Sequence, residues 1–443
     1  MIAVYDTIFL HYFVRLRLTV ARWIFYNHNR FGKKGGRNTM RCTFKPLGCT
    51  AKTGTLFAAV CIAASVSATS AGTAVSNGVK WVDGRMLPLE GRCFDDVDSY
   101  YDRFPGRVST NINAGVWKLK SHTAGMQFRF RTDSRKLIFR WMPTSASLAA
   151  DHMPATGQSG IDVYRRDGTG RWHYVKTGFV YDAKAGGILE TGWTPGDPCL
   201  VNLPLYNGIR EFTVGMDTNA TFSPLGPRAS GISRPVVFYG TSITQGGCAS
   251  RPGMAFVNIV GRDLDVPVCN LGFSGAGRME LGMAGYLARI DASCYVLDCL
   301  RNMGCLYDKP GAAFQDMAAA GYDLKAPTKK QDPLAMVRFR YEPFVRALRA
   351  KRPDVPIVMA GRCDVFCDGP DGKDKLVREL YEKLKAEGWK NLFYLPKDEM
   401  YSGDCEGTVD GGHPNDLGMM SMAKAFGKAV REALGLRNNA RKE

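Results

Sequence analysis

The sequence lacks several features that would assign it to a well-marked class of proteins. Its 443 residues contain no internal repeat and no C-x-x-C pair, and only six of them are histidine. A repeat array and a cysteine–histidine zinc module are therefore not expected. No nucleic-acid-binding motif occurs, and no apolar run reaches the ~20 residues that a membrane-spanning helix needs. What remains is a globular composition, with 45% hydrophobic and 23% charged residues.

Acidic residues are scarce near the N-terminus, and this accounts for more than half of the net charge of +17. Residues 1–79 contain ten Lys or Arg and one acid, Asp6, which gives +9 and leaves +8 for the other 364 residues. The excess of positive charge thus lies mainly in the N-terminal leader, and the rest of the chain is only mildly basic. This distribution does not indicate a basic surface that binds the phosphate backbone of a nucleic acid. We therefore predict that the protein has no nucleic-acid partner.

Residues 1–71 form a basic leader in which we predict a secretory signal peptide. Three basic residues between positions 41 and 52 precede an apolar run at 56–68, and small residues follow up to position 71. This order is typical of a signal peptide, which we place at residues 40–71 with Met40 as the true start. We expect a secreted or periplasmic protein that has no stable membrane span once the signal is removed.

Two other interpretations of the leader stay open. Residues 8–28 have the composition of an amphipathic helix that lies on a membrane surface. Cys61 offers a site for a lipid anchor, but Val60 before it suits lipoprotein processing poorly, so the anchored form is the less favoured one.

Ten cysteines follow the leader, and an exported protein can oxidise some of them. In the sequence they do not cluster with histidines at the spacing of metal ligands. We therefore expect buried free thiols with one or two disulfides, no metal site and no cofactor.

Residues 80–230 predict an antiparallel β-sandwich of the jelly-roll type. Apolar and polar residues alternate with period two in short segments between turn residues, and no convincing helix interrupts them. The clearest segments are 126–131, 136–141, 160–166 and 171–177. Gly168 and Gly170 separate the last two segments, which is typical of a hairpin.

Strands and helices alternate from residue 234 to residue 436, which predicts a five-stranded parallel sheet with helices on both faces. The strands are expected at 235–239, 266–271, 294–299, 356–360 and 391–395. The helices are expected at 254–264, 279–290, 333–350, 371–387 and 415–434, before a polar tail at 437–443. Ligands of such α/β domains bind at the carboxyl ends of the strands, so the chemistry is expected there.

Four polar blocks follow the predicted strands. They are G-T-S-I-T-Q-G at 240–246, N-L-G-F-S-G-A-G at 270–277, R-N-M-G at 301–304 and D-G-G-H-P-N-D at 410–416. In order and spacing they resemble the blocks of the SGNH, or GDSL-type, hydrolases. G-I-D-V-Y at 160–164 resembles the glycine-x-aspartate-leucine-tyrosine signature in the N-terminal domain of one two-domain branch. The resemblance implies a flavodoxin-like hydrolase domain with ester-hydrolase activity.

The resemblance also implies a role for each matching residue. Ser242 would be the nucleophile, and its backbone N–H would form an oxyanion hole with the N–H of Gly275 and the side-chain amide of Asn302. His413 would be the general base, and Asp410 the carboxylate that orients it. These residue types suit the chemistry, because a serine hydroxyl needs an adjacent base at neutral pH and an imidazole can take and return its proton.

Three departures from the family pattern bear on function. Thr241 stands where the GDSL consensus has aspartate. Arg301 stands where the two-domain branch often has proline. Together with Arg251, which follows block one in C-A-S-R-P-G, it is a candidate for binding an anionic group of the substrate; the alternative is that each caps a helix end or packs against the sandwich. Residues 303–331 form a long connection that is either a lid or wall of the site or a surface insertion.

The sequence therefore predicts an exported serine esterase that releases short acyl groups, above all acetyl, from a carbohydrate. A lipid acyl hydrolase of the lysophospholipase or lipase type is the alternative enzyme. A catalytically inactive sugar-binding protein is the alternative outside enzymes, and the intact set of five motif residues argues against it. The sequence specifies neither the sugar and the acyl position nor the oligomeric state.

Overall fold

The computed structural model describes residues 72–107, 112–304, 315–319, 321, 323, 332–362, 372–400 and 404–437. These residues belong to one compact unit, Thr69–Glu443. Outside them lie the predicted signal peptide at 40–71 with Met40 and Cys61, the helix at 8–28, most of the connection 303–331 and most of the tail 437–443. Among the helices that are described, none is long and apolar enough to cross a membrane.

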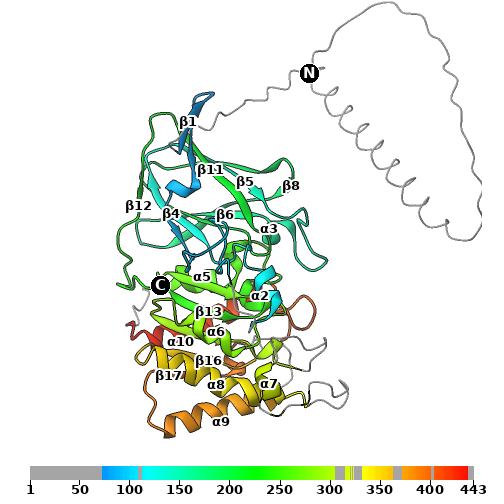
Figure 1. Ribbon diagram of the computed structural model, residues 1–443. Coiled ribbons are helices and arrows are strands. Elements are labelled where there is room, and N and C mark those ends of the chain that lie inside the picture. Colours follow the sequence, from blue (N-terminus) through cyan, green and yellow to red (C-terminus); the bar gives the residue numbers. More distant parts are fainter. Residues whose placement is uncertain are drawn as a thin grey trace, which may run out of the picture. The chain divides into compact units, whose positions relative to one another are not determined.

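The N-terminal part folds into two antiparallel sheets, which lie in the upper half of Figure 1. The first sheet has the order β1 (Thr73–Ser76), β2 (Val79–Asp83), β11 (Ile209–Asp217), β5 (Lys136–Pro143), β9 (Gly186–Gly192) and β8 (Val180–Asp182). The second has the order β12 (Phe222–Pro224), β4 (Gln127–Thr132), β10 (Pro198–Asn202), β6 (Ile161–Arg166) and β7 (Trp172–Gly178), with β3 (Leu89–Glu90) paired to β4. The predicted antiparallel sandwich is confirmed.

Large apolar side chains fill the space between the two sheets. They include Phe128 and Phe130 of β4, Phe139 and Trp141 of β5, and Phe212 of β11, each at most 1% exposed. Their spacing of two along a strand is the alternation seen in the sequence, because side chains at i and i+2 point to the same face. Burying an aromatic or aliphatic side chain contributes roughly 1.5–3 kcal/mol, so this shared core holds the sheets together.

The predicted hairpin between the segments at 160–166 and 171–177 is confirmed. β6 and β7 pair in antiparallel register, and the side chain of Asp167 closes their turn by accepting hydrogen bonds from the N–H groups of Thr169 and Arg171, each at 2.9 Å.

The expectation that no helix interrupts the sandwich is wrong. The described residues contain η1 (Gly84–Met86), α2 (Ala114–Lys118) and α3 (Ala155–Gln158). None exceeds five residues, which is too short to produce a helical period of apolar residues. α2 begins instead at a local cap, where the Asn113 side chain accepts a hydrogen bond from the N–H of Gly115 at 2.7 Å.

The C-terminal part contains a five-stranded parallel sheet with the order β14, β13, β15, β16, β17. The strands are β13 (Val236–Gly240), β14 (Val268–Gly272), β15 (Cys294–Asp298), β16 (Ile357–Ala360) and β17 (Leu392–Leu395). Each predicted strand is present, with ends shifted by at most two residues. This is the order of a flavodoxin-like sheet. The chain runs from β13 to β14 on one side and then crosses to β15 on the other side, so the order of the strands reverses at β13. The predicted α/β fold is confirmed.

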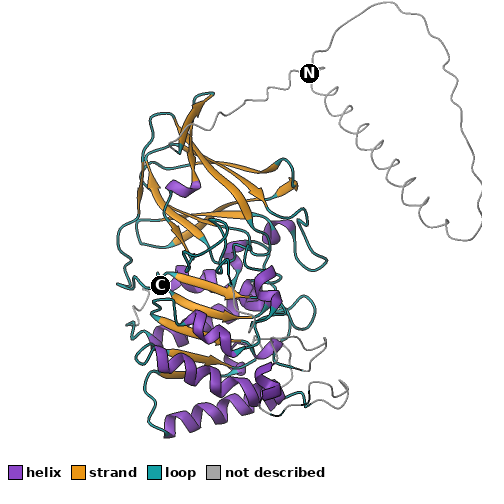
Figure 2. Cartoon of the chain, viewed as in Figure 1, coloured by secondary structure: helices purple, strands orange, loops and turns teal. Residues whose placement is uncertain are grey.

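Helices cover both faces of this sheet (Figure 2). One face carries α6 (Leu281–Leu287), α8 (Ala335–Lys351) and α9 (Gly372–Ala386), and the other carries α5 (Phe256–Leu264) and α10 (Asp416–Ala433). Shorter helices are η2 (Pro252–Met254), α7 (Gln315–Ala319) and η6 (Lys397–Met400). Phe238 of β13 contacts Phe256 of α5 and Phe426 of α10, whereas its neighbour Tyr239 stacks on Phe344 of α8. A strand buried on both faces explains the continuous apolar run at 236–239.

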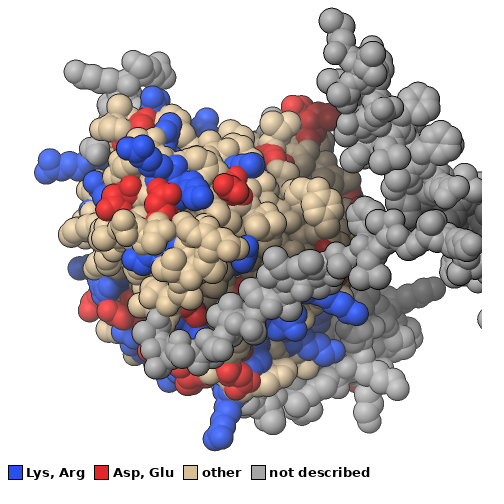
Figure 3. Space-filling model, turned by 90° about the horizontal axis from the view of Figure 1, so that it is seen from above, with Lys and Arg blue, Asp and Glu red and all other residues tan. Residues whose placement is uncertain are grey.

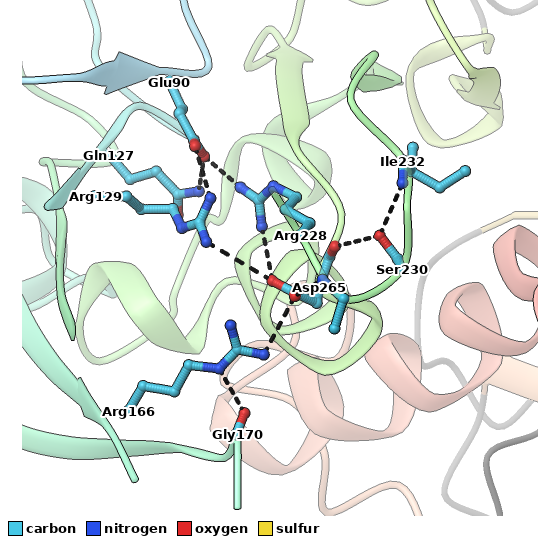
Figure 4. A network of polar contacts seen from close by, with 10 residues as sticks. Glu90, Gln127, Arg129, Arg166, Gly170, Arg228, Ser230, Ile232 and Asp265 are labelled. Carbon is cyan, nitrogen blue, oxygen red and sulfur yellow. Dashed lines mark hydrogen bonds and ion pairs between the residues drawn. The ribbon is translucent and has the colours of Figure 1, made fainter. Parts of the chain in front are cut away.

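An ion network joins the sandwich to the hydrolase domain (Figure 4). Asp265, which follows α5, accepts two hydrogen bonds at 3.2 Å. One comes from Arg166 of β6 and the other from Arg228, which lies in the segment between β12 and β13. Burial raises the pKa of Asp265, but a backbone hydrogen bond and the guanidinium charges outweigh it and hold the pKa below its ordinary value. Arg228 and Arg129 also pair with Glu90 of β3. The paired charges hold β6 against the segment between α5 and β14.

The cysteines agree with the predicted mixture of thiols and disulfides. Cys93 forms a disulfide with Cys269 of β14, and Cys405 is also disulfide-bonded. Buried free thiols are Cys199, Cys248, Cys294 and Cys299. Cys305, Cys363 and Cys367 lie outside the described residues.

Charged side chains of both signs are intermixed on the face seen in Figure 3. That face therefore has no uniformly basic surface of the kind that binds the phosphate backbone of a nucleic acid.

Candidate active site

The first three polar blocks lie next to one another at one edge of the parallel sheet. β13 pairs with β14 on one side and with β15 on the other, and all three are parallel. The segments that follow them therefore start from neighbouring carboxyl ends. The fourth block precedes α10 and reaches the same place through a hydrogen bond of His413.

Ser242 is the first residue of α4 (Ser242–Gln245), directly after β13. Thr241 caps this helix, because its Oγ1 accepts a hydrogen bond from the N–H of Ile243 at 3.3 Å. Thr244 completes a capping box by accepting from the N–H of Thr241 at 3.1 Å. Threonine and aspartate are both good N-caps, so the departure at position 241 leaves the turn intact.

Ser242, His413 and Asp410 form a continuous chain of hydrogen bonds. Ser242 Oγ lies 3.0 Å from His413 Nε2, and His413 Nδ1 lies 2.8 Å from Asp410 Oδ2. An ionised carboxylate can only accept hydrogen bonds, so the proton of a neutral imidazole belongs on Nδ1 and Nε2 is left to accept the serine proton. The structure thus brings together three residues that are distant in the sequence, since Ser242 and His413 lie 171 positions apart.

Asp410 is held in its charged form. Partial burial raises its pKa, but hydrogen bonds from the backbone N–H of His413 (2.7 Å), from its ring and from the N–H of Gly412 (2.9 Å) outweigh burial and lower the pKa to about 2. The same bonds fold residues 410–413 into a tight turn. Asp410 and His413 keep 43% and 23% of their side chains exposed, so the site opens to solvent.

Gly275 and Asn302 have the features that an oxyanion hole requires. Gly275 has φ +69°, and the space where a Cβ would point is open. Asn302 ends η3 (Leu300–Asn302) after β15. Among the described residues, the Nδ2 of Asn302 is buried without a hydrogen-bond acceptor. A buried donor without a partner is costly, and an incoming negative oxygen would satisfy it.

The block-two loop packs directly on the end of β13. A Cβ at Gly277 would lie 1.8 Å from the carbonyl oxygen of Gly240, so only glycine fits at this position. The close approach keeps Gly275 beside the turn that holds Ser242.

Sequence reasoning missed the supporting residues Gln245 and His122. Gln245 Nε2 donates to His122 Nδ1 at 2.9 Å and to the carbonyl oxygen of Leu205 at 3.0 Å. Its Oε1 accepts from the N–H of Ser274 at 3.0 Å, next to Gly275. Burial and a nearby arginine lower the pKa of His122 to about 3, so its ring is neutral and Nδ1 can accept.

That arginine is Arg103, a sandwich residue that is 1% exposed. Its Nη1 donates to the carbonyl oxygens of Asn270 (2.9 Å) and Gly272 (3.0 Å) at the carboxyl end of β14. Burial lowers the pKa of Arg103 to about 9, which still leaves it charged at neutral pH. The sandwich therefore supplies hydrogen bonds to the strand that leads into block two. No local pattern in the sequence signals this contact.

The two arginines that were candidates for substrate binding have different surroundings. Arg251 Nη1 donates to Asp162 Oδ2 at 2.8 Å and to the hydroxyl of Tyr164, and its guanidinium lies 4.2 Å from the ring centre of Tyr174. These contacts correspond to the alternative in which Arg251 packs against the sandwich. Arg301 lies in η3 beside Asn302 and is partly buried, and its role in substrate binding stays a prediction.

No pattern in the sequence indicates that a cysteine and two histidines meet beside the site. His152, Cys248 and His413 each place one potential ligand atom within 4.8 Å of those of the other two. These three residues are far apart in the sequence, and the fold brings them together from the sandwich, from the segment after α4 and from block four.

Two family models together match most of the described chain. Residues 233–431 match the GDSL-like lipase/acylhydrolase family, and residues 79–222 match the N-terminus of the SGNH-hydrolase-type esterases, which is named after its GxDLY motif. No protein of curated function matches the chain at a significant level.

Three solved structures illustrate the similarity. A protein described as a GDSL-like lipase from Bacteroides ovatus is 27% identical with a TM-score of 0.65, over 81% of this chain and 99% of that one. The salicylyl-acyltransferase SsfX3 from a tetracycline biosynthetic pathway is 20% identical with a TM-score of 0.59, over 82% and 99%. A family two carbohydrate esterase from Clostridium thermocellum is 14% identical with a TM-score of 0.47, over 70% and 93%.

The matches confirm the resemblance that the four blocks and the G-I-D-V-Y segment indicate. The chain belongs to the GDSL-like (SGNH) hydrolase family, in the branch that carries the GxDLY-type N-terminal domain, and is a carboxylic ester hydrolase.

Proposed function

We propose that this protein is a serine esterase in which Ser242 is the nucleophile, His413 the general base and Asp410 the orienting carboxylate. The observation that carries the proposal is the chain from Ser242 Oγ to His413 Nε2 (3.0 Å) and from His413 Nδ1 to Asp410 Oδ2 (2.8 Å). A hydroxyl, an imidazole and a carboxylate in this order activate a serine for attack on an ester.

In the first half of the reaction Ser242 Oγ attacks the carbonyl carbon of the ester while its proton moves to His413 Nε2. The carbonyl oxygen becomes negative, and the N–H groups of Ser242 and Gly275 and the amide of Asn302 donate to it. When this intermediate collapses, His413 gives the proton to the leaving alcohol, and the acyl group stays on Ser242.

In the second half a water molecule replaces the alcohol. His413 takes a proton from the water as its oxygen attacks the acyl carbon, and the same three donors hold the negative oxygen. Collapse returns the proton to Ser242 Oγ and releases the carboxylic acid. The carboxylate of Asp410 stabilises the imidazolium in both halves, and its lowered pKa keeps it charged throughout.

The proposed substrate is a short acyl ester, above all an acetyl ester, on a carbohydrate. The exposure of Asp410 and His413 supports this, because an ester at the edge of a large sugar can reach an open site. The sandwich supports it by analogy, since double-sheet folds of this type occur in lectins. Export is proposed with the signal peptide at 40–71, and the disulfide between Cys93 and Cys269 supports an oxidising compartment.

The purified protein tests the proposal on three ester classes: acetylated oligosaccharides, a chromogenic acetate and long-chain lipid esters. We expect turnover of the two acetates and its loss in Ser242→Ala, with unchanged thermal unfolding. Ser223→Ala is the matched control, because Ser223 is exposed on the edge strand β12. Residual activity of Ser242→Ala within tenfold of the parent would contradict the nucleophile.

The same assay separates the two alternatives. Preference for long-chain esters would identify a lipase or lysophospholipase. Binding of oligosaccharides with no turnover of any ester would identify an inactive sugar-binding protein.

A further inference from the structure

A cluster of two imidazoles and one thiol lies beside the proposed base. The potential ligand atoms of His152, Cys248 and His413 are all within 4.8 Å of one another. The ring centres of His152 and His413 are 5.6 Å apart. The mechanism described above uses only His413 of these three.

The fold holds Cys248 in place. Cys248 lies two residues after Gly246, the left-handed residue that caps α4; it is 5% exposed and has φ +72° itself. A non-glycine residue in this region is uncommon and persists only where the surrounding structure holds it. The backbone therefore holds the thiol in a defined position beside His413.

His152 belongs to the sandwich and has more freedom. It lies in the segment between β5 and α3, where two hydrogen bonds between Ala150 and Met153, at 3.0 and 3.1 Å, close a small loop. The side chain is exposed, so its ring can turn at low cost towards the other two groups.

Two nitrogens and one sulfur are the ligands that Zn²⁺ and related ions prefer. In a tetrahedral site with bonds of about 2.0–2.3 Å, ligand atoms lie roughly 3–4 Å apart. The three atoms are within 4.8 Å of one another, so binding requires only small shifts, and the exposed His152 has the most freedom to make them. His413 is already prepared as a ligand, because its Nδ1 is bound to Asp410 at 2.8 Å. A carboxylate on the second nitrogen is the usual support of a metal-bound histidine.

We propose that His152, Cys248 and His413 form an inhibitory site for thiophilic divalent ions of the zinc class. The ion binds Nε2 of His413, a ring nitrogen of His152 and Sγ of Cys248, and the thiol proton is released to solvent. Nε2 then has no lone pair for the proton of Ser242. Inhibition rests on the proposed function, whereas binding of the ion does not.

Co²⁺ tests binding without any need for activity. A thiolate bound to Co²⁺ gives a charge-transfer absorption, which we expect from the parent protein at one ion per chain and not from Cys248→Ser. His152→Gln removes a proposed ligand and is expected to weaken Co²⁺ binding by at least ~10-fold, the lower end of what the loss of a residue that merely supports a ligand costs. Cys199→Ser and His173→Gln are the matched controls, since Cys199 is a buried free thiol in β10 and His173 is an exposed histidine in β7. Both controls should bind Co²⁺ as the parent does.

Zn²⁺ tests inhibition with the chromogenic acetate. We expect His152→Gln and Cys248→Ser, checked by thermal unfolding, to need at least ~10-fold more Zn²⁺ for half-inhibition than the parent and the controls do. An absorption band that survives in Cys248→Ser, or equal Zn²⁺ sensitivity of all variants, overturns the site. A parent that shows the band but has no esterase activity overturns the proposed function and leaves the metal site standing.

Discussion

Asp162 of the sandwich and Arg251 of the hydrolase domain form an ion pair with Nη1 and Oδ2 2.8 Å apart. The carboxylate of Asp162 is fully buried and also accepts hydrogen bonds from the N–H of Gly253 and from the amide of Asn202, each at 2.8 Å. Asp162 is the aspartate of the G-I-D-V-Y signature. In this protein the signature therefore fastens the sandwich to the segment that follows the helix of Ser242.

Arg251→Ala is expected to lower the free energy of unfolding by ~3–5 kcal/mol, because it leaves a buried carboxylate without its cation. Urea denaturation measures the change. Arg171→Ala is the control, since the Arg171 side chain is 66% exposed, and it should change stability by less than ~0.5 kcal/mol. A variant at position 251 with parental stability and a raised KM for anionic substrates alone would restore the substrate-binding interpretation.

Arg301→Ala is expected to raise KM several-fold for an acylated uronic-acid or sulfated sugar and to leave the neutral sugar nearly unchanged. The reason is that a guanidinium next to Asn302 binds a carboxylate or sulfate in a bidentate manner. The advantage of the anionic substrate should fall with added salt, because partly exposed charges are screened over ~10 Å at 0.1 M. Equal effects on both substrates would show that Arg301 supports the structure instead.

His413→Ala is expected to reduce kcat by ~10²–10⁴-fold, the usual contribution of a general base. Asp410→Asn should be less damaging, because Asp410 orients the imidazole and does not itself transfer the proton. Steady-state kinetics on one acetate substrate compares the two variants. Equal losses would mean that the carboxylate matters more than we propose, and a larger loss at position 410 would mean that the two roles are misassigned.

Gln245→Leu is expected to reduce kcat by ~10–100-fold with little change in KM. Gln245 holds the N–H of Ser274 next to Gly275, and an oxyanion donor acts chiefly in the transition state. Gln158→Leu is the control, because Gln158 is also a buried amide but bonds to Ser147 in the sandwich. If both variants lose stability and keep kcat, Gln245 has no positioning role.

The stability of the protein is expected to fall as pH decreases from about 6.5 to about 3, partly through His122. Its pKa is lowered from 6.5 to about 3 in the folded protein. Between these values the unfolded chain binds a proton that the folded protein does not, so acidification favours unfolding. His122→Gln should reduce this pH dependence in urea denaturation. Identical slopes in the parent and His122→Gln would contradict the shift.

The elements that the sequence predicted well are those with a local signal. The strands of the parallel sheet are short apolar runs between turn residues, and their order along the chain implies which ends meet. Pattern alone places Ser242, Asp410 and His413 in polar blocks near these strand ends or at the start of α10. Their proposed roles come from the resemblance of the blocks to the SGNH hydrolases, because hydrophobic pattern and glycine-rich turns do not assign chemistry.

The residues that were missed depend on contacts between distant segments. Gln245 is part of block one, but its partner His122 lies 123 positions away in a sandwich loop. His152 and Cys248 meet His413 only because the sandwich is fixed to the hydrolase domain. The ion pair of Arg251 with the buried Asp162 is a further contact of this kind, since the two residues lie 89 positions apart and no periodicity reveals the pairing. It favours the alternative in which Arg251 packs against the sandwich, and substrate binding by Arg251 stays a prediction.

Arg103 makes the hydrolase domain depend on a part of the chain that is synthesised before it. The carbonyl oxygens of Asn270 and Gly272 receive their hydrogen bonds from a side chain that lies 167 and 169 positions earlier. A hydrolase domain transplanted without its sandwich would present these oxygens unsatisfied at the edge of its own catalytic loop. The hydrolase domain of this protein therefore relies on the sandwich for the hydrogen bonding at the end of β14, and separating the two domains removes it.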